Sequence, residues 1–502
     1  MKKIWLFFAA AALLAAACSK GFYEHGSSMP EMFNGSAQYE SAMPDVVSPP
    51  EGGSGDQFDD IKENPFVKVA DAPSSSFSID ADGAAYAYMR LMVQRGMLPD
   101  RNSVRIEEYL NYFTFNYPEP TGEETLAINA DAGPCPWDDS HMLLRLGLKG
   151  KSLPENEIPA ANYILLIDTS GSMSGDDRIE LVKTGLTTMV DYLRPQDRIA
   201  IITYSGSVKK LLESTLISEG AADIKKAIKS LNASGSTAGG EAMKMAYEEA
   251  SAHYVTGGNN RIIMCTDGDF NVGVSSTEAL VKMVESYQEK GIYLSIMGFG
   301  QGNFQDSRME NLSNHGNGTY TYIDSEEEMM KVFVNERSHF YAVANDTKCQ
   351  VRFNPEVVDS YRLIGYENRL MSSAEFEDSK KDAGELGAGQ TVTALYEIVL
   401  ADGVTNLEET GSPATFEARY KFSLKDKESR SLTKVIYFGC EVDENMVFAS
   451  GVAAYGLVLR DSEYKGSATM DMAYELVSQS TGFDPHGYRA QFAELIKKAR
   501  SF

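Results

Sequence analysis

The stretch that decides the fold runs from Tyr163 to Ser172 and reads YILLIDTSGS. Its first half, Tyr163–Ile167, is continuously apolar, which is typical of a strand that is covered on both faces. The second half consists of small polar residues, which favour a loop and offer one carboxylate and two hydroxyl groups. The stretch therefore predicts a polar loop at the carboxyl end of a buried strand.

Two later loops have the same character. Thr237 lies within Ser-Gly-Ser-Thr-Ala-Gly-Gly, and Asp267 lies within Cys-Thr-Asp-Gly-Asp, directly after the apolar run Ile262–Cys265. Oxygen atoms from separate loops suit a hard divalent cation. The three loops hold too few carboxylates to saturate such an ion, so water or a partner must complete its shell.

In order and spacing the three loops resemble the metal-ion-dependent adhesion site of von Willebrand factor type A (VWA) domains. In that site an Asp-x-Ser-x-Ser loop, a distant Thr and a distant Asp surround one Mg²⁺. The resemblance implies that the ion, Mg²⁺ or alternatively Mn²⁺ or Ca²⁺, is held partly through water by five residues, namely Asp168, Ser170, Ser172, Thr237 and Asp267.

The similarity extends along the chain from Phe77 onward. Four further segments look like those of bacterial VWA lipoproteins: Phe77–Asp80, Val104–Tyr109, Thr266–Gly273 and Tyr361–Arg369. That family carries an associated N-terminal segment and a C-terminal domain of unknown function. The resemblance implies a binding site and an exported protein, but it names no partner.

Strand-like and helix-like patterns alternate from about Asn162 to Arg337. Continuous apolar runs at Ile199–Thr203 and Ile292–Phe299 are separated by helical stripes such as the one that begins at Ile179. Such alternation predicts an α/β fold, with a doubly wound, mostly parallel sheet of the VWA, Rossmann-like kind. Ligands of such sheets bind beyond the carboxyl ends of the strands, where the strand order reverses.

Alternating strand patterns occur on both sides of this region. We therefore predict a β-sandwich formed by residues 123–158 and 341–442, with the VWA domain, residues 159–340, inserted into it. Two independent half-sandwiches would each be too small to bury a good core. Helical patterns predict a small VWA-associated segment at 76–122 and a helical region at 443–502.

The N-terminus has the pattern of a signal peptide, residues 1–17, with Lys2 and Lys3 before an apolar stretch. Cys18 follows Ala15-Ala16-Ala17, which resembles a bacterial lipoprotein box and implies lipid attachment at Cys18, although Ala15 stands where Leu is usual. An ordinary secretory signal is the alternative. The Gly-, Ser- and Pro-rich residues after Cys18 predict a disordered tether over 18–75.

The formal net charge of −26 disfavours binding to nucleic acid and unassisted docking on anionic lipid. The glycines of Gly298–Gly302 lack the spacing of a dinucleotide fingerprint, so no nucleotide is expected. Four cysteines follow the signal region, and their pairing stays open: Cys135, Cys265, Cys349 and Cys440.

We expect a non-enzymatic envelope lipoprotein that docks a protein partner, through a carboxylate that binds the metal ion. Its lipid anchor would hold it to the bacterial outer membrane, on the periplasmic or the surface face. One alternative is a structural ion within a scaffold protein. Another is a hydrolase, either through Ser174 of Gly-Ser-Met-Ser-Gly with Asp267 and His315, or metal-dependent with Asp269 as an extra carboxylate.

Overall fold

The structure is a computed structural model of the 502-residue chain. It describes residues 58–502, except 236–238, 269–276, 301–305, 380, 382, 408–409 and 440–441. The expected signal peptide, Cys18 and the expected tether up to residue 57 lie outside the described residues, and so do Thr237, Asp269 and Cys440. None of the described helices is long and apolar enough to span a membrane.

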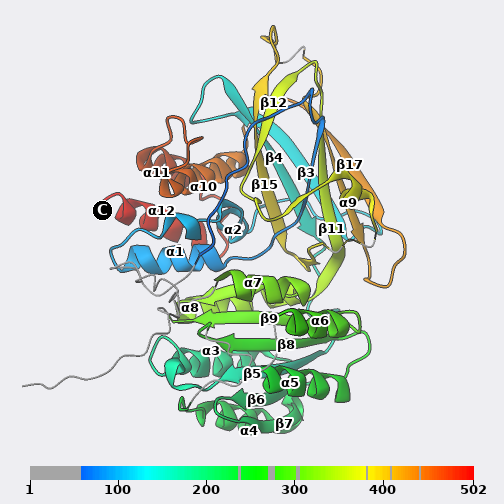
Figure 1. Ribbon diagram of the computed structural model, residues 1–502, viewed down its shortest axis with the longest axis vertical. Coiled ribbons are helices and arrows are strands. Elements are labelled where there is room, and N and C mark those ends of the chain that lie inside the picture. Colours follow the sequence, from blue (N-terminus) through cyan, green and yellow to red (C-terminus); the bar gives the residue numbers. More distant parts are fainter. Residues whose placement is uncertain are drawn as a thin grey trace, which may run out of the picture. The chain divides into compact units, whose positions relative to one another are not determined.

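The α/β domain has a six-stranded sheet in the order β10-β9-β8-β5-β6-β7 (Figure 1). All neighbours are parallel except the edge strand β7, which runs antiparallel to β6. The strands span β5 Ala161–Asp168, β6 Arg198–Tyr204, β7 Val208–Leu216, β8 Asn259–Thr266, β9 Ile292–Phe299 and β10 Tyr320–Ile323. Each apolar run that predicted a strand lies inside an observed one.

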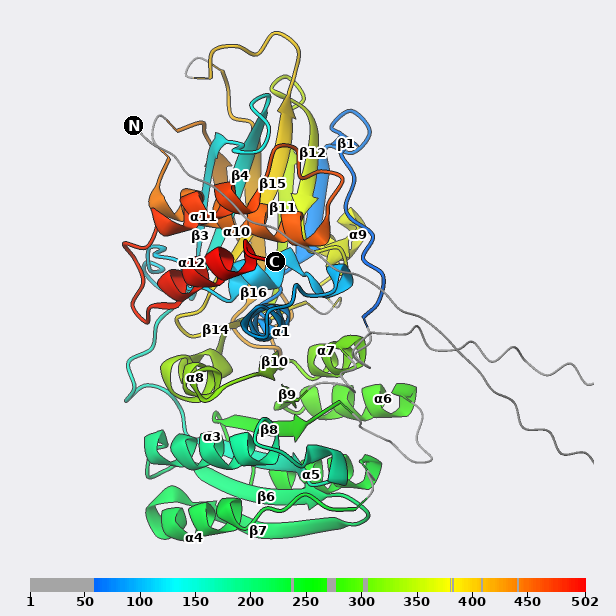
Figure 2. The same ribbon diagram turned by 90° about the vertical axis from the view of Figure 1, so that its left-hand side faces the viewer.

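Helices cover both faces of this sheet, as Figure 2 shows. One face packs against α3 (Ile179–Tyr192), α4 (Ile217–Lys229) and α8 (Glu326–Met330). The other packs against α5 (Gly240–Ala252), α6 (Thr277–Gln288) and α7 (Asp306–His315). The doubly wound arrangement is therefore confirmed, and the strand order reverses at β5, which β6 and β8 flank.

Two antiparallel sheets, β1-β12-β15-β4-β3 and β13-β2-β11-β16-β17, share one apolar core and form the β-sandwich (Figure 1). The strands span β1 Val67–Lys68, β2 Ser74–Ser78, β3 Leu126–Pro134, β4 His141–Gly150, β11 Ala342–Phe353, β12 Val358–Ile364, β13 Leu370–Met371, β14 Leu386–Gly387 (paired with β11), β15 Thr391–Leu400, β16 Ala414–Lys421 and β17 Arg430–Ile436. Strand β4 precedes the α/β domain and pairs with β15, which follows it. The predicted insertion is thus confirmed.

The helices at the two ends of the described chain share a core of their own. They are α1 Ala84–Gln94, η1 Arg101–Ser103, α2 Ile106–Asn111, α10 Glu444–Arg460, α11 Met470–Ser478 and α12 Tyr488–Ala499. This core also includes Leu143, Ile364 and Leu395 of the sandwich strands. The two helical regions, predicted separately, therefore form one layer against the sandwich. A short helix α9 (Ser373–Glu377) packs beside β2.

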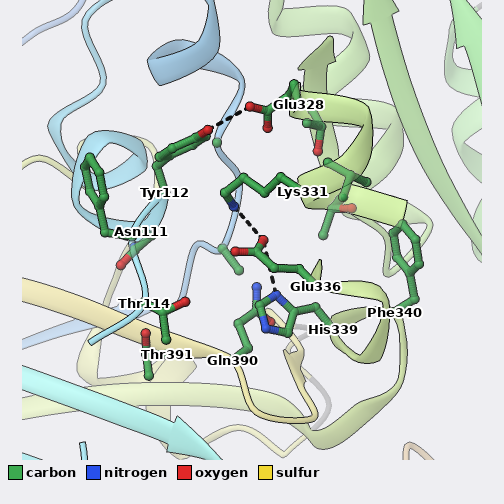
Figure 3. Close-up of a pocket in the computed structure, with 16 residues that line it drawn as sticks. Asn111, Tyr112, Thr114, Glu328, Lys331, Glu336, His339, Phe340, Gln390 and Thr391 are labelled. Atoms are coloured by element: carbon green, nitrogen blue, oxygen red, sulfur yellow. Dashed lines mark hydrogen bonds and ion pairs between the residues drawn. The ribbon is translucent and has the colours of Figure 1, made fainter. Parts of the chain in front are cut away.

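A network of buried charges connects this helical layer to the last helix of the α/β domain. Arg90 of α1 donates to Glu328 of α8 at 2.6 Å, and Tyr112 donates to the same carboxylate at 2.8 Å. The π-helical turn η3 (Lys331–Asn335) then leads into the 3₁₀ turn η4 (Arg337–Phe340). Figure 3 shows Lys331 reaching from η3 toward Glu336. The two side chains form an ion pair at 2.5 Å, beside a cavity of about 60 Å³.

The prediction of a disordered tether is wrong for residues 58–75. Asn64 is buried and donates to the carbonyl oxygens of Leu363 and Gly365 at 3.1 and 2.8 Å. Strand β1 pairs with β12, and Phe58 packs against Tyr88. Backbone hydrogen bonds need little apolar surface, so the polar composition of this stretch did not indicate that it pairs with the sandwich. Strand β2 likewise belongs to the sandwich, although its last residues were assigned to the helical segment.

Candidate metal centre

The two predicted aspartate ligands lie at the carboxyl ends of two central strands of the parallel sheet. Asp168 is the last residue of β5, and Asp267 directly follows β8. These strands are neighbours, with Ile167 paired to Cys265, so the two loops leave the sheet side by side. Asp168 is 0% exposed and Asp267 is 2% exposed. The fold thus brings together two carboxylates that are 99 positions apart in sequence.

The first loop folds back over Asp168. The backbone N–H of Ser170 donates to Asp168 Oδ1 at 2.8 Å, and the hydroxyl oxygens of Ser170 and Ser172 lie 2.9 Å apart. The 3₁₀ turn η2 (Gly171–Met173) follows, and the buried side chain of Met173 anchors it in the core below. Three of the five predicted ligands are therefore gathered by a single turn.

The loop that carries Thr237 is hydrogen-bonded to this turn. Gly171 donates its N–H to the carbonyl oxygen of Gly235 at 2.9 Å, and Ser234 donates to the carbonyl oxygen of Thr169 at 2.7 Å. Thr237 itself lies outside the described residues. The chain just before it, at Ser234 and Gly235, is held against the first loop.

The electrostatics of the site favour a cation. The pKa of Asp168 is raised to about 6, mainly by burial and also by the charge of Asp267, while hydrogen bonds from Ser170 oppose the rise. A positive ion would remove this penalty for the ionised form. The donors are all oxygen atoms, as hard divalent ions require. No group of three or more His, Cys, Asp or Glu in the described part of the chain could hold a metal, so hydroxyl ligands would be needed here.

Three residues around the site were not predicted. Arg178 donates to the carbonyl oxygen of Ser172 at 2.7 Å and fixes the far end of the turn. Thr266 donates to Asp168 Oδ2 at 3.4 Å, and Thr169 donates through both N–H and hydroxyl to the carbonyl oxygen of Tyr204. Thr169 and Thr266 adjoin predicted ligands in the sequence, whereas nothing in the sequence marked Arg178, which lies six positions after Ser172.

The residues of the alternative serine hydrolase are not assembled. Ser174 is exposed after η2 in an ordinary extended conformation, with φ −73° and ψ 129°. His315 ends α7 and pairs with Glu285 at 2.9 Å. Its neighbour Gly316 bonds to Leu294 near the start of β9, at the sheet edge opposite Asp168. A Ser–Asp–His triad through Ser174 is therefore excluded by geometry.

The described cysteines form no disulfide. Cys135, Cys265 and Cys349 are buried free thiols, and burial raises the pKa of Cys135 and Cys265 to about 12. Cys440 lies outside the described residues. None of the disulfides that the sequence allowed among Cys135, Cys265 and Cys349 is therefore formed.

A doubly wound sheet with aspartate and serine side chains at the carboxyl ends of β5 and β8 is typical of von Willebrand factor type A proteins. Comparison with known families assigns the chain to the same class. The family described as "von Willebrand factor type A domain" matches residues 162–336, and that described as "von Willebrand factor" matches residues 53–145. The family described as "Uncharacterized protein YfbK, C-terminal" matches residues 338–502. The chain belongs to the YfbK family of bacterial VWA proteins.

One relative is the "Uncharacterized protein YfbK" of Escherichia coli K12. It is 37% identical over 468 residues, which cover 88% of this chain and 80% of the relative. The human "Inter-alpha-trypsin inhibitor heavy chain H3" is 29% identical over 177 residues, 34% of this chain and 20% of that protein. A solved structure titled "von Willebrand factor type A from Catenulispora acidiphila" is 14% identical with a TM-score of 0.40, covering 76% of this chain and 91% of that chain.

Proposed function

We propose that this protein binds one Mg²⁺, or Mn²⁺ or Ca²⁺, at its sheet edge and docks a protein partner through the ion, without catalytic turnover. The ligands would be Asp168, Ser170, Ser172, Thr237 and Asp267. The observation that supports the proposal best is the meeting of two buried carboxylates with two hydroxyl groups at the carboxyl ends of β5 and β8.

Two carboxylates leave a divalent ion with residual positive charge. When bound, the ion supplies a Lewis-acidic position that a carboxylate from another protein can occupy. The roles of this chain's own residues are to hold the ion and to orient it: Ser170 and Arg178 fix the turn, and Met173 anchors it. Such docking is charge-assisted and depends on the ion.

Docking accounts for the site better than catalysis does. General acid–base chemistry requires a proton-transfer group within reach of the reacting atoms. His315, the histidine of the predicted alternative triad, lies near the start of β9, at the opposite end of the strands from Asp168. The acidic chain, with a net charge of −26, repels other acidic proteins, so specificity would come from surfaces that surround the ion.

Anchoring through an acylated Cys18 to a bacterial membrane, with the outer membrane favoured, is part of the same proposal. Residues 18–57 would connect the folded body to the lipid. An adhesion module of this kind would act at the cell envelope, on partners within its reach.

The proposal is tested by capturing partners from the native envelope with the full chain, with Mg²⁺ or with EDTA. Thr237→Ala is compared with the wild type, and Ser174→Ala is the matched control, because Ser174 lies in the same region but is not a ligand. We expect a partner that is lost with EDTA and with Thr237→Ala but kept by Ser174→Ala. A partner set that ignores the metal, with Mg²⁺ still bound, would favour a structural ion instead.

A further inference from the structure

A polar pocket lies outside both the candidate metal centre and the cavity beside Lys331. Its volume is about 460 Å³, and four segments that are far apart in sequence line it. They are the described N-terminal stretch, the η1–α2 region, α7 and the loop after β12. Each segment contributes at least one polar lining residue, in the same order Asp60, Glu107, Asn311 and Glu367. The proposed function makes no use of this pocket.

Glu107 is the unusual residue of the pocket. It lies on α2 and is only 1% exposed. Its Oε2 atom is buried and has no hydrogen-bond partner among the described residues. Gly365 packs directly against it: a Cβ atom there would lie 2.5 Å from that oxygen, and Gly365 has a φ of +74° that favours glycine. A buried acceptor without a donor is costly, so it points to a missing partner.

Neighbouring cationic side chains are already engaged. Arg460 donates to the carbonyl oxygen of Val104 at 2.6 Å and to Glu367 at 2.5 Å. Arg105 pairs with Glu108 at 2.7 Å and with Glu310 at 2.9 Å.

Arg369, the other arginine that lines the pocket, donates to Asp80 at 3.0 Å and to the amide oxygen of Asn314 at 3.0 Å. Five carboxylate residues line the pocket, against three cationic ones. Both arginines are engaged, and the third cation, Lys62, is exposed to solvent. The buried Glu107 therefore still lacks a positive charge and a hydrogen-bond donor.

We infer that this pocket binds the primary ammonium group of a small polar solute, with Glu107 as its main acceptor. An ammonium group supplies one positive charge and three donors without a fixed coordination geometry. A metal ion fits less well, because no cluster of three or more His, Cys, Asp or Glu able to hold one occurs in the described part of the chain. The exposed Asp60 at the pocket's N-terminal side adds attraction for a cation.

The test titrates the full chain by calorimetry at low ionic strength with three amines and their neutral counterparts. The pairs are glucosamine with glucose, 1,4-diaminobutane with 1,4-butanediol, and lysine with norleucine. We expect at least one amine to bind while its counterpart does not. Absence of binding by all three amines, or equal binding of an amine and its counterpart, would overturn the inference. Binding of CaCl₂ that survives Asp168→Ala and is lost in Glu107→Gln, without amine binding, would show a metal site instead.

Variants then locate the amine. Glu107→Gln keeps the shape of the side chain and is expected to lower amine affinity about tenfold or more, because a bound ammonium group stabilises the ionised carboxylate and the amide cannot ionise. Asp60→Lys should lower it about threefold through the charge at the rim, whereas Asp402→Lys, the same charge change at an exposed site outside the pocket, should have no effect. Amine binding unchanged in Glu107→Gln would contradict the assignment. Mg²⁺ affinity, measured in the same variants, is expected to stay as in the wild type.

Discussion

At the scale of single residues, the two most informative side chains are buried acids, Asp168 and Glu107. The first lies at a sheet edge beside a second carboxylate, and the second lies in a pocket where no described donor reaches its Oε2 atom. Burial raises the pKa of both, to about 6 and about 8. Buried acids with raised pKa values often mark functional sites, because a bound cation can offset the cost of their charge.

Asp168→Ala is expected to abolish Mg²⁺ binding with little loss of fold. Loss of the hydrogen bonds from Ser170 and Thr266 is offset by removal of a buried charge, so the metal-free variant should unfold within about 1 kcal/mol of the wild type. Calorimetry measures the affinity, and circular dichroism checks the fold. Ser174→Ala is the control that should bind as the wild type does. Unchanged Mg²⁺ affinity in Asp168→Ala would contradict the proposed site.

Glu107→Gln is expected to alter the pH dependence of stability. Glu107 has a pKa of about 8 in the folded chain and an ordinary value of 4.5, owing first to burial and then to Glu367, with Arg460 opposing and Asp80 and Glu108 adding to the shift. The folded state therefore holds a proton more tightly, and the stability from this group is lost as pH rises from about 4.5 through 8. Melting temperatures at pH 6 and pH 9 should differ less in the variant than in the wild type. An equal difference in both would show that Glu107 does not titrate there.

At the scale of elements, the end of the α/β domain is tied to the helical layer by charges rather than by apolar contact alone. Helix α8 carries Glu328, which receives hydrogen bonds from Arg90 and Tyr112. The turn after it carries the Lys331–Glu336 pair (Figure 3). Burial disfavours the ionised form of Glu336, yet Lys331 and His339 hold its pKa at about 2. The stability of α8 and η3 therefore depends on these charged contacts.

Lys331→Met is expected to destabilise the chain by about 3 kcal/mol at pH 7, because it leaves the largely buried Glu336, 16% exposed, without its main partner. In the wild type this pair stabilises the fold above pH 4.5, and its contribution is lost as pH falls from 4.5 toward 2. Thermal unfolding at pH 7 and pH 3 measures both effects. The double variant Lys331→Met with Glu336→Gln is the control and should recover part of the loss. A single variant as stable as the wild type at pH 7 would contradict this account.

At the scale of the whole molecule, the candidate metal centre and the proposed solute pocket use different residues, and the proposed lipid anchor would connect the folded body to a membrane. The chain carries 72 acidic and 46 basic residues, so nonspecific contact with anionic surfaces is disfavoured. Stable attachment would then depend on the anchor and not on the folded surface.

Cys18→Ser is expected to release the protein into the soluble fraction or to leave it unprocessed, because the acylated thiol is absent. Fractionation of cells and mass measurement of the N-terminus check this outcome. The Asp168→Ala variant should stay with the membrane and serves as the control. A processed Cys18→Ser protein that still partitions with membranes would exclude the lipid anchor.

The sequence by itself determined the parts that depend on neighbouring residues. Continuous apolar runs identified the strands of the parallel sheet, and the small polar residues after them identified the Asp168 and Asp267 loops. These signals are local, since a short run of residues is enough to indicate a buried strand or a polar loop. The α/β insertion also followed, because one sandwich buries a better core than two halves.

Only the tertiary structure decided which distant segments meet. It placed residues 58–75 on the folded body, joined α1 and α2 to α10–α12 in one core, and excluded a triad of Ser174 with His315. In the sequence Glu107 was one more acid within a helical pattern. The burial and the raised pKa of Glu107 depend on its surroundings, which include Gly365, Glu367 and Arg460. These three residues lie more than 250 positions away in the sequence. Contacts of that kind depend on shape and burial across the whole core, which no short stretch of sequence records.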